Sequence, residues 1–222
     1  MQRIRQEGDP ILILYGYWRS GCTWRVRMAL ELKGLPYEYR PINLLKGEDC
    51  TPEYKAINPA GLVPTLLDGK HTLSESLAIL EYLEEKYPGP VSLLPRRFED
   101  RAEVRRLALH IVSGIQPLQN LNMLEKIEAL GGTQARGQWG KTVVADGFAA
   151  LETMLKQTAG KYSFGDEVTL ADLCLVPQVY SAGRFGVSME PYPIINAIHS
   201  RLAELEVLKP AHPDAMPDAV KQ

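Results

Sequence analysis

The hydrophobic and polar positions of this chain follow two different periods. Up to residue 90, short apolar runs of strand length alternate with stretches in which apolar residues return every three or four positions. From residue 98 onward only the helical period remains. The pattern predicts an α/β domain over residues 1–90 and an all-helical domain over residues 91–222, with a linker at residues 88–98.

The first domain begins with residues 11–17, a short branched and aromatic run typical of a buried strand. A helical pattern then continues to Gly34, a natural C-terminal cap, and a second extended run covers residues 37–44. Strand, helix and strand at these lengths predict a βαβ unit with parallel strands. After it we expect a short helix, a hairpin that turns at Asp68-Gly69 and another helix, at residues 52–57, 61–73 and 75–87.

The second domain shows helical periodicity at residues 99–122, 138–158 and 169–181, with a break at Gly131-Gly132. Thr169 and Asp172 have the spacing of a capping box at the start of the third of these helices. Because that helix is apolar nearly all round, we expect it to be the buried spine of the domain. The Pro- and Asp-bearing segment after Lys209 is expected to be a loosely held tail.

The candidate chemistry lies in residues 19–27, RSGCTWRVR, at the expected strand-to-helix turn. The start of a helix presents unpaired N–H groups and a partial positive charge, which stabilise an anion such as a thiolate or carboxylate. Ser20 offers a hydroxyl and Cys22 a thiol, while Arg25 and Arg27 add positive charge one turn further in. The turn is therefore predicted to bind a negative ligand.

Composition narrows the classes of partner. A net charge of −2 over 222 residues gives no overall field that favours nucleic acid or an anionic membrane, so we expect a small-molecule or protein partner. Three scattered cysteines form neither a disulfide framework nor a zinc cluster. Residues 1–9 lack the apolar run of a signal peptide, and no stretch reaches membrane-spanning length. A cytoplasmic protein without a metal is expected.

Several segments together resemble the cytosolic glutathione transferases, over almost the whole chain. RSGCTWRVRMAL at residues 19–30 is similar to the signature of the zeta class, which includes maleylacetoacetate isomerase. Further similar segments are Asn58-Pro59 with VPT at 63–65, SESLAI at 74–79, QPLQN at 116–120 and GDEVTLADLCLVPQ at 165–178. One position departs from the class, which usually has a second serine where this chain has Gly21. Ser20 is thus the one hydroxyl just before the cysteine.

The resemblance implies a thioredoxin-like N-terminal domain, an all-helical C-terminal domain and glutathione as the cofactor. In this class Ser20 would donate a hydrogen bond to the glutathione thiolate; its alternative is a plain N-cap, worth roughly 1 kcal/mol. Cys22 would line the site, since Arg25 stands where a dithiol redox motif needs a second cysteine. The resemblance also implies a cis Val63-Pro64 bond, which exposes the backbone of Val63 to a peptide ligand.

Two residues are expected to bind the γ-glutamyl end of glutathione. Ser76 would bind the γ-glutamyl carboxylate at the start of a helix, and Glu75 would form an ion pair with the ammonium. Both residues are also typical of a helix N-terminus that binds no ligand. On the substrate side the resemblance implies Arg25, Gln116 and Arg184. Arg184, in a glycine-flanked loop after the apolar helix, would grip a substrate carboxylate, while Gln116 would add a neutral hydrogen bond at the glutathione and substrate sites.

The resemblance thus predicts a glutathione-dependent cis–trans isomerase that converts maleylacetoacetate to fumarylacetoacetate in tyrosine and phenylalanine catabolism, acting as a homodimer on a small dicarboxylate keto acid. A general transferase acting on α-haloacids would use the same Ser20 and Arg184. A non-enzymatic module with the transferase fold is the alternative from another class. The intact set of Ser20, Val63-Pro64 and Glu75-Ser76 favours an enzyme, because a scaffold does not need a thiol site.

Overall fold

The computed structural model describes residues 11–89 and 91–220, so that the expected signal-free N-terminus, residues 1–9, lies outside the described residues. The chain divides into two compact units. One comprises the residues up to Leu93 together with those from Leu205 onward, and the other comprises residues 94–204. This grouping differs from the expected division at residue 90, because residues 205–220 join the first unit.

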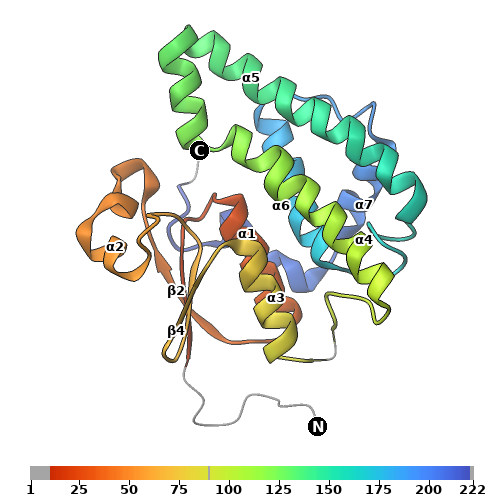
Figure 1. Ribbon diagram of the computed structural model, residues 1–222, viewed down its shortest axis with the longest axis horizontal. Helices are drawn as coiled ribbons and strands as arrows, with labels where there is room; N and C mark the ends of the chain where they lie inside the picture. Colours follow the sequence, from red (N-terminus) through yellow and green to blue (C-terminus); the bar gives the residue numbers. More distant parts are fainter. Residues whose placement is uncertain (1–10, 90, 221–222) are drawn as a thin grey trace. The chain divides into compact units, whose positions relative to one another are not determined.

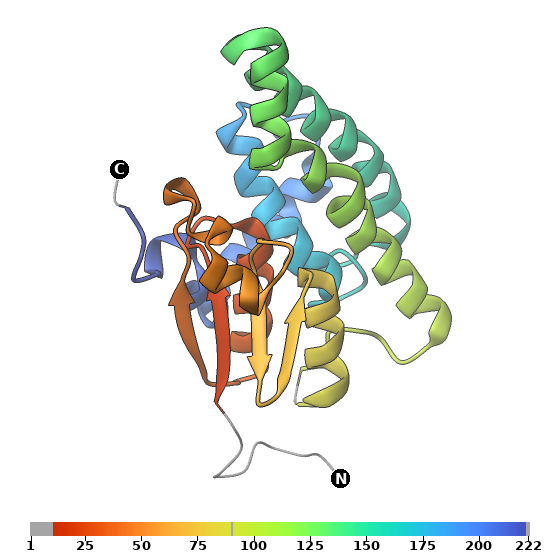
Figure 2. The ribbon, with the colours of Figure 1, turned by 60° about the vertical axis from the view of Figure 1, so that its left-hand side comes forward.

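A four-stranded sheet in the order β2-β1-β3-β4 forms the centre of the first unit (Figure 2). β1 and β2 are parallel, which confirms the predicted βαβ unit, and β3 is antiparallel to both β1 and β4. The side chains of Leu12 and Leu14 in β1 are fully buried, as expected of a central strand. The strands are Leu12–Gly16, Tyr37–Pro41, Thr65–Asp68 and His71–Ser74.

Two helices, α1 (Gly21–Leu32) and α3 (Ser76–Lys86), lie side by side against one face of this sheet (Figures 1 and 2). The second strand ends earlier than predicted, and two 3₁₀ turns follow it at Leu44–Lys46 and Glu48–Cys50. The short helix α2 spans Pro52–Ile57, as predicted, with the Thr51 hydroxyl accepting from the Tyr54 N–H at its start. The two helices that begin at candidate site residues, α1 and α3, therefore pack as neighbours.

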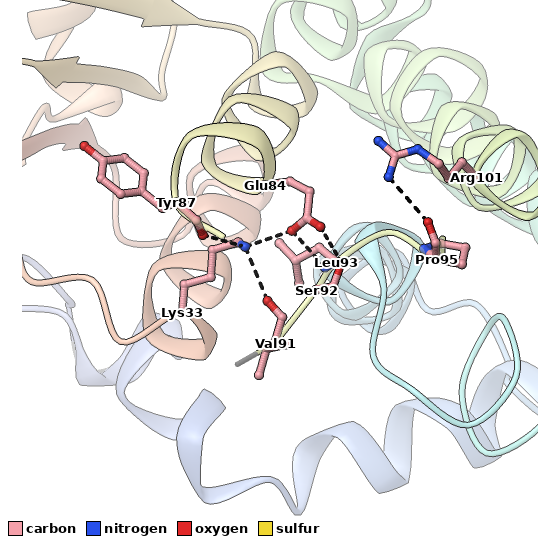
Figure 3. Close-up of polar contacts among 8 residues, drawn as sticks. All are labelled: Lys33, Glu84, Tyr87, Val91, Ser92, Leu93, Pro95 and Arg101. Atoms are coloured by element: carbon pink, nitrogen blue, oxygen red, sulfur yellow. Dashed lines mark hydrogen bonds and ion pairs between the residues drawn. The ribbon is translucent and has the colours of Figure 1, made fainter. Parts of the chain in front are cut away.

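A buried ion pair fixes the chain as it leaves α3 (Figure 3). Lys33 Nζ lies 2.8 Å from Glu84 Oε2, and it also donates to the carbonyls of Tyr87 and Val91. Glu84 accepts from the Leu93 N–H at 2.9 Å. Burial by itself raises the pKa of the Glu84 carboxyl, but these hydrogen bonds outweigh it and hold that pKa below its ordinary value. Residues 91–93 are therefore held to the first unit.

The C-terminal segment is held firmly, so the expectation of a loose tail is wrong. It forms 3₁₀ helices at Glu206–Ala211 and Pro213–Ala215, and the first of these contacts α1. Met216 is buried in an apolar cluster with Tyr17 and Trp18. Asp218 Oδ2 then accepts from the Trp18 backbone N–H at 3.0 Å and lies 3.3 Å from the hydroxyl of Tyr39. Sequence periodicity did not indicate these contacts because the partners lie about 200 residues apart.

The second unit consists of α4 (Phe98–Leu109), α5 (Leu121–Thr158), α6 (Leu170–Arg184) and α7 (Pro193–Ala203), labelled in Figure 1. α6 contacts the other three helices, and its residues from Leu170 to Val179 are buried, which confirms the predicted spine. Gly132 interrupts α5 with non-helical backbone at φ 79° and ψ 177°, at the predicted break. The predicted helix over residues 99–122 is wrong in extent, because α4 ends at Leu109, and α5 begins at Leu121, 17 residues before the predicted start at residue 138. α7 was not predicted.

The start of α6 has the predicted capping box. Asp172 Oδ2 accepts from the Thr169 N–H at 2.8 Å, while Oδ1 accepts from the Ser163 N–H at 2.8 Å. The helix continues three residues beyond its predicted end, so Arg184 lies in its last turn and the expected loop placement is wrong. In the described part of the chain, no helix combines the length and the apolar character needed to cross a membrane.

Candidate active site

Ser20 caps the N-terminus of α1. Its backbone is extended, with φ −68° and ψ 117°, and its Oγ accepts from the Thr23 N–H at 3.2 Å. A serine hydroxyl has one donor and two acceptor positions, so this bond leaves its O–H hydrogen available. The N-cap role and the role of donor to a ligand anion are therefore compatible: Ser20 can cap the helix and still donate. Its side chain is half-buried, which leaves it accessible from one side.

Arg25 brings the starts of α1 and α3 together. Its Nη1 donates to Ser76 Oγ at 3.1 Å and lies 3.7 Å from Cys22 Sγ. Cys22 is in the first turn of α1 and is half-buried, while Ser76 is the first residue of α3 and is 4% exposed. Two helix N-termini, each with free backbone N–H groups, therefore meet at one guanidinium.

The turn into α3 is backbone-strained. Glu75 has φ 66°, and it is the one non-glycine residue of the described chain with positive φ. Residues held in such sparsely populated regions cluster at binding and catalytic sites. The exposed Glu75 side chain makes no capping bond to α3, so the strain does not arise from an N-cap interaction. The positive φ of Glu75 turns the backbone between β4 and α3, and α3 begins at the next residue, Ser76.

The peptide bond Val63-Pro64 is cis, as predicted. No backbone hydrogen bond of Val63 occurs among the described residues, so its N–H and C=O are available to a peptide ligand. The preceding carbonyl, that of Leu62, accepts from the Tyr54 hydroxyl at 2.7 Å and the Asn58 amide at 2.8 Å. These two residues hold the loop that presents Val63. Sequence reasoning noted Asn58-Pro59 without a role and missed Tyr54, whose partners lie eight or more residues on.

Arg27 does not join the anion site as expected. It is fully buried, and its guanidinium donates to the carbonyls of Ala211 at 2.9 Å and Trp18 at 3.0 Å. Burial lowers the pKa of this guanidinium, opposed by the nearby Tyr39 and Asp218. Arg27 thus fastens the C-terminal segment to the turn that carries Ser20, a role for which the sequence holds no local signal.

The remaining site candidates belong to the helical unit. A π-helix at His110–Ile115 follows α4 and leads directly into a 3₁₀ turn at Gln116–Gln119. Gln116 is half-buried at the start of that turn, and π-helices are frequent at functional sites. Arg184 is exposed in the last turn of α6. Among the described residues, no cluster of three His, Cys, Asp or Glu side chains is arranged to hold a metal ion.

Comparison with known proteins identifies the family. A model of the glutathione S-transferase N-terminal domain matches residues 14–91, and a model of the C-terminal domain matches residues 124–210. Mouse maleylacetoacetate isomerase is 50% identical over 215 residues, which is 96% of each chain. The chain belongs to the glutathione S-transferase family. The predicted glutathione transferase fold and the resemblance to the zeta class are thereby confirmed.

Two solved structures of zeta-type glutathione S-transferases are similar over nearly the whole chain. A maleylacetoacetate isomerase from Anaeromyxobacter dehalogenans 2CP-1, solved with GSH in its active site, is 46% identical with a TM-score of 0.87, covering 95% of this chain and 98% of its own. It has also been solved with dicarboxyethyl glutathione and citrate. A bacterial zeta-class maleyl pyruvate isomerase is 44% identical with a TM-score of 0.90, covering 94% of this chain and 100% of its own.

Proposed function

We propose that this glutathione S-transferase is a glutathione-dependent cis–trans isomerase that converts maleylacetoacetate to fumarylacetoacetate in the catabolism of phenylalanine and tyrosine. The observation that carries the proposal is the 50% identity, over 96% of both chains, to a mouse protein named maleylacetoacetate isomerase. We further propose a cytoplasmic homodimer, on family resemblance.

The residues of the first unit suit glutathione. Ser20 and Ser76 each accept a bond from the protein and keep an O–H to donate, and the Val63 backbone is available to pair with a peptide. We propose that Ser76 binds the γ-glutamyl carboxylate and Glu75 the ammonium. Pro64 fixes the direction of the Val63 backbone, and Cys22 lines the site beside the thiol.

When bound, glutathione supplies a thiolate that adds to the cis double bond, so that the bond becomes single, rotates and re-forms as trans when the thiolate leaves. Ser20 donates a hydrogen bond to the sulfur, a bond that is strongest when the sulfur is an anion, and it thereby lowers the pKa of the thiol. We propose that Arg184 binds a substrate carboxylate and that Gln116 donates a neutral hydrogen bond to glutathione or the substrate. An isomerase of this kind needs no protein nucleophile.

Maleylpyruvate is a second candidate substrate, because the maleyl pyruvate isomerase structure aligns with a TM-score of 0.90. It carries the same cis double bond beside a carbonyl, so the proposed residues would serve both substrates. Acceptance of α-haloacids is the alternative activity on the same Ser20 and Arg184.

The test is turnover of maleylacetoacetate, maleylpyruvate and dichloroacetate by the purified protein with glutathione, without it, and with S-methylglutathione in its place. S-methylglutathione is the matched control, because it keeps the tripeptide and lacks the thiol. We expect isomerisation of maleylacetoacetate only with glutathione. Retention on immobilised glutathione without turnover of any of the three would contradict the enzyme and favour a binding module.

A further inference from the structure

Arg25 carries a buried charge that the protein does not balance. Its side chain is 1% exposed, yet no Asp or Glu oxygen of the described residues lies within ion-pair distance of it. Its Nε is buried without a hydrogen-bond partner among those residues. A buried charge is costly unless it is paired and hydrogen-bonded. The burial of this unpaired guanidinium therefore favours an anion from outside the chain that binds nearby.

Arg27 provides an internal comparison, because it lies two residues along the same helix and is equally buried. Two backbone carbonyls accept from its Nε and Nη2, at 2.9 and 3.0 Å, and its Nη1 is buried without a partner among the described residues, as the Nε of Arg25 is. Arg27 differs in having the Asp218 carboxylate nearby. Arg25 instead donates to a hydroxyl and a thiol, both at helix starts and both in the candidate site. The partners of Arg27 are structural, whereas those of Arg25 are groups that can themselves bind a ligand.

The bond from Arg25 also sets the direction of the Ser76 hydroxyl. An arginine only donates, so Ser76 Oγ must accept in the 3.1 Å bond. The hydrogen of that hydroxyl is then free to point away from Arg25, toward a group that accepts. A carboxylate is such a group, and the first turn of α3 adds backbone N–H groups and a partial positive charge in its favour.

We propose that Arg25 is a positioning residue for glutathione: it holds the Ser76 hydroxyl as a donor toward the γ-glutamyl carboxylate, and that carboxylate balances its buried charge. The inference rests on the proposed glutathione site and moves Arg25 from the substrate to the cofactor. Arg25 acts through Ser76 and does not touch the ligand.

The test compares two ligands by titration calorimetry with Arg25→Gln and the unsubstituted protein. The ligands are glutathione and 4-aminobutyryl-cysteinylglycine, which lacks only the γ-glutamyl carboxylate. We expect the unsubstituted protein to prefer glutathione by about tenfold or more, the worth of hydrogen bonds to a charged group. Arg25→Gln should lose most of that preference and bind the analogue as before. A merely structural arginine would weaken both ligands equally, and that outcome would overturn the proposal.

Two further variants sharpen the result. Arg27→Gln removes the other buried arginine of α1 and is the matched control: it should lower the melting temperature and keep the preference for glutathione. Ser76→Ala should remove the effect of Arg25, so that adding Arg25→Gln to it changes glutathione affinity little. Fully multiplicative effects of the two substitutions would overturn the proposal, because Arg25 would then act independently of Ser76.

If Arg25→Gln does not fold, Arg25→Lys keeps the test available, since lysine retains the charge but makes a single-point contact. We expect an intermediate preference for glutathione, and an unchanged preference would count against the role. The result of the isomerase assay is independent of the measured preference for glutathione. Absence of turnover leaves the ligand preference measurable, whereas absence of any preference in the unsubstituted protein overturns the Arg25 role even if turnover is present.

Discussion

The two units hold their candidate residues in different ways. In the first unit, Ser20, Cys22 and Ser76 lie half-buried or buried at helix starts, tied by hydrogen bonds to Thr23 and Arg25. In the helical unit, Gln116 is half-buried in a 3₁₀ turn and Arg184 is exposed at a helix end. Side chains that bind glutathione always meet the same ligand, so hydrogen bonds within the protein can fix their positions. Side chains that bind the substrate meet ligands of different shape and can lie at the surface. Substitutions in the first unit should therefore affect every substrate, and those in the second only some.

The largest expected effect is that of Ser20→Ala. Gly21 supplies no side chain to take over the hydrogen bond, so kcat/KM should fall by roughly 10²-fold or more for every substrate, the scale of a lost charge-stabilising donor. Cys22→Ala is the control in the same turn, and it should mainly raise KM. Steady-state kinetics with maleylacetoacetate and maleylpyruvate measure both. Equal losses in the two variants would remove the distinction between the serine and the cysteine.

The second-largest expected effect is on the stability of the helical unit. Asp172→Ala leaves the N–H groups of Ser163 and Thr169 without their acceptor and removes the capping box of α6. We expect a loss of about 2 kcal/mol in the free energy of unfolding. Thr153→Ala on the exposed face of α5 is a control that should change little. Urea denaturation followed by circular dichroism measures both, and a stable Asp172→Ala would contradict the structural role of the box.

Arg184→Ala tests the substrate side of the comparison. Loss of a charge-assisted contact to a carboxylate should raise KM by about tenfold for maleylacetoacetate while the affinity for glutathione stays nearly unchanged. Arg184→Lys should recover part of the loss, because lysine keeps the charge but not the planar fork. Initial rates at varied substrate and varied glutathione separate the two constants. Equal losses for both ligands would place Arg184 in a shared or structural role.

The smallest effect is a pH dependence of stability in the first unit. Burial by itself raises the pKa of the Asp68 carboxyl, but hydrogen bonds from Lys86, Tyr87 and Tyr82 outweigh it and hold that pKa below its ordinary value. A lowered pKa in the folded state means that the stabilisation is present above the unfolded-state value, about 4, and is lost as the pH falls through the folded value.

Asp68→Asn should therefore cost on the order of 1 kcal/mol at neutral pH and less as the medium becomes acidic. Thermal unfolding of both proteins between neutral pH and pH 3 measures the difference. A stability difference that stays constant over this pH range would mean that Asp68 stabilises the protein through packing and not through its charge.

Local signals in the sequence predicted much of this structure. The strand-to-helix turn at Ser20, the interruption at Gly132 and the capping box at Thr169 all follow from residues close together in the chain. The cis Val63-Pro64 bond was implied by the family resemblance. Features fixed by distant partners were missed. Asp218 reaches back to Trp18, and Arg27 to Ala211, and no periodicity encodes such a pairing.

The candidate site divides in the same way. Sequence spacing and resemblance identified Ser20, Cys22 and Ser76, but the burial of Arg25 became evident only when α1 and α3 were seen side by side. The signals for α7 were present in the sequence but were overlooked: Pro193 stands at the first helical position, where proline is favoured, and the buried residues Ile195, Ile198 and Leu202 have helical spacing. The continuation of α6 to Arg184 through Gly183 overrode the low helix propensity of glycine.

Stabilisation of the glutathione thiolate by the Ser20 hydroxyl can be measured by titrating the bound thiolate through its ultraviolet absorbance. Spectra are taken against the same protein saturated with S-methylglutathione, which cancels the absorbance of the protein's own thiols and tyrosines. We expect a bound-thiol pKa near neutrality in the unsubstituted protein and in Cys22→Ala, and a value close to that of a free thiol, about 8.5, in Ser20→Ala. A Ser20→Ala protein that keeps the lowered pKa, together with a Cys22→Ala protein that loses it, would mean that Cys22 and not Ser20 stabilises the thiolate.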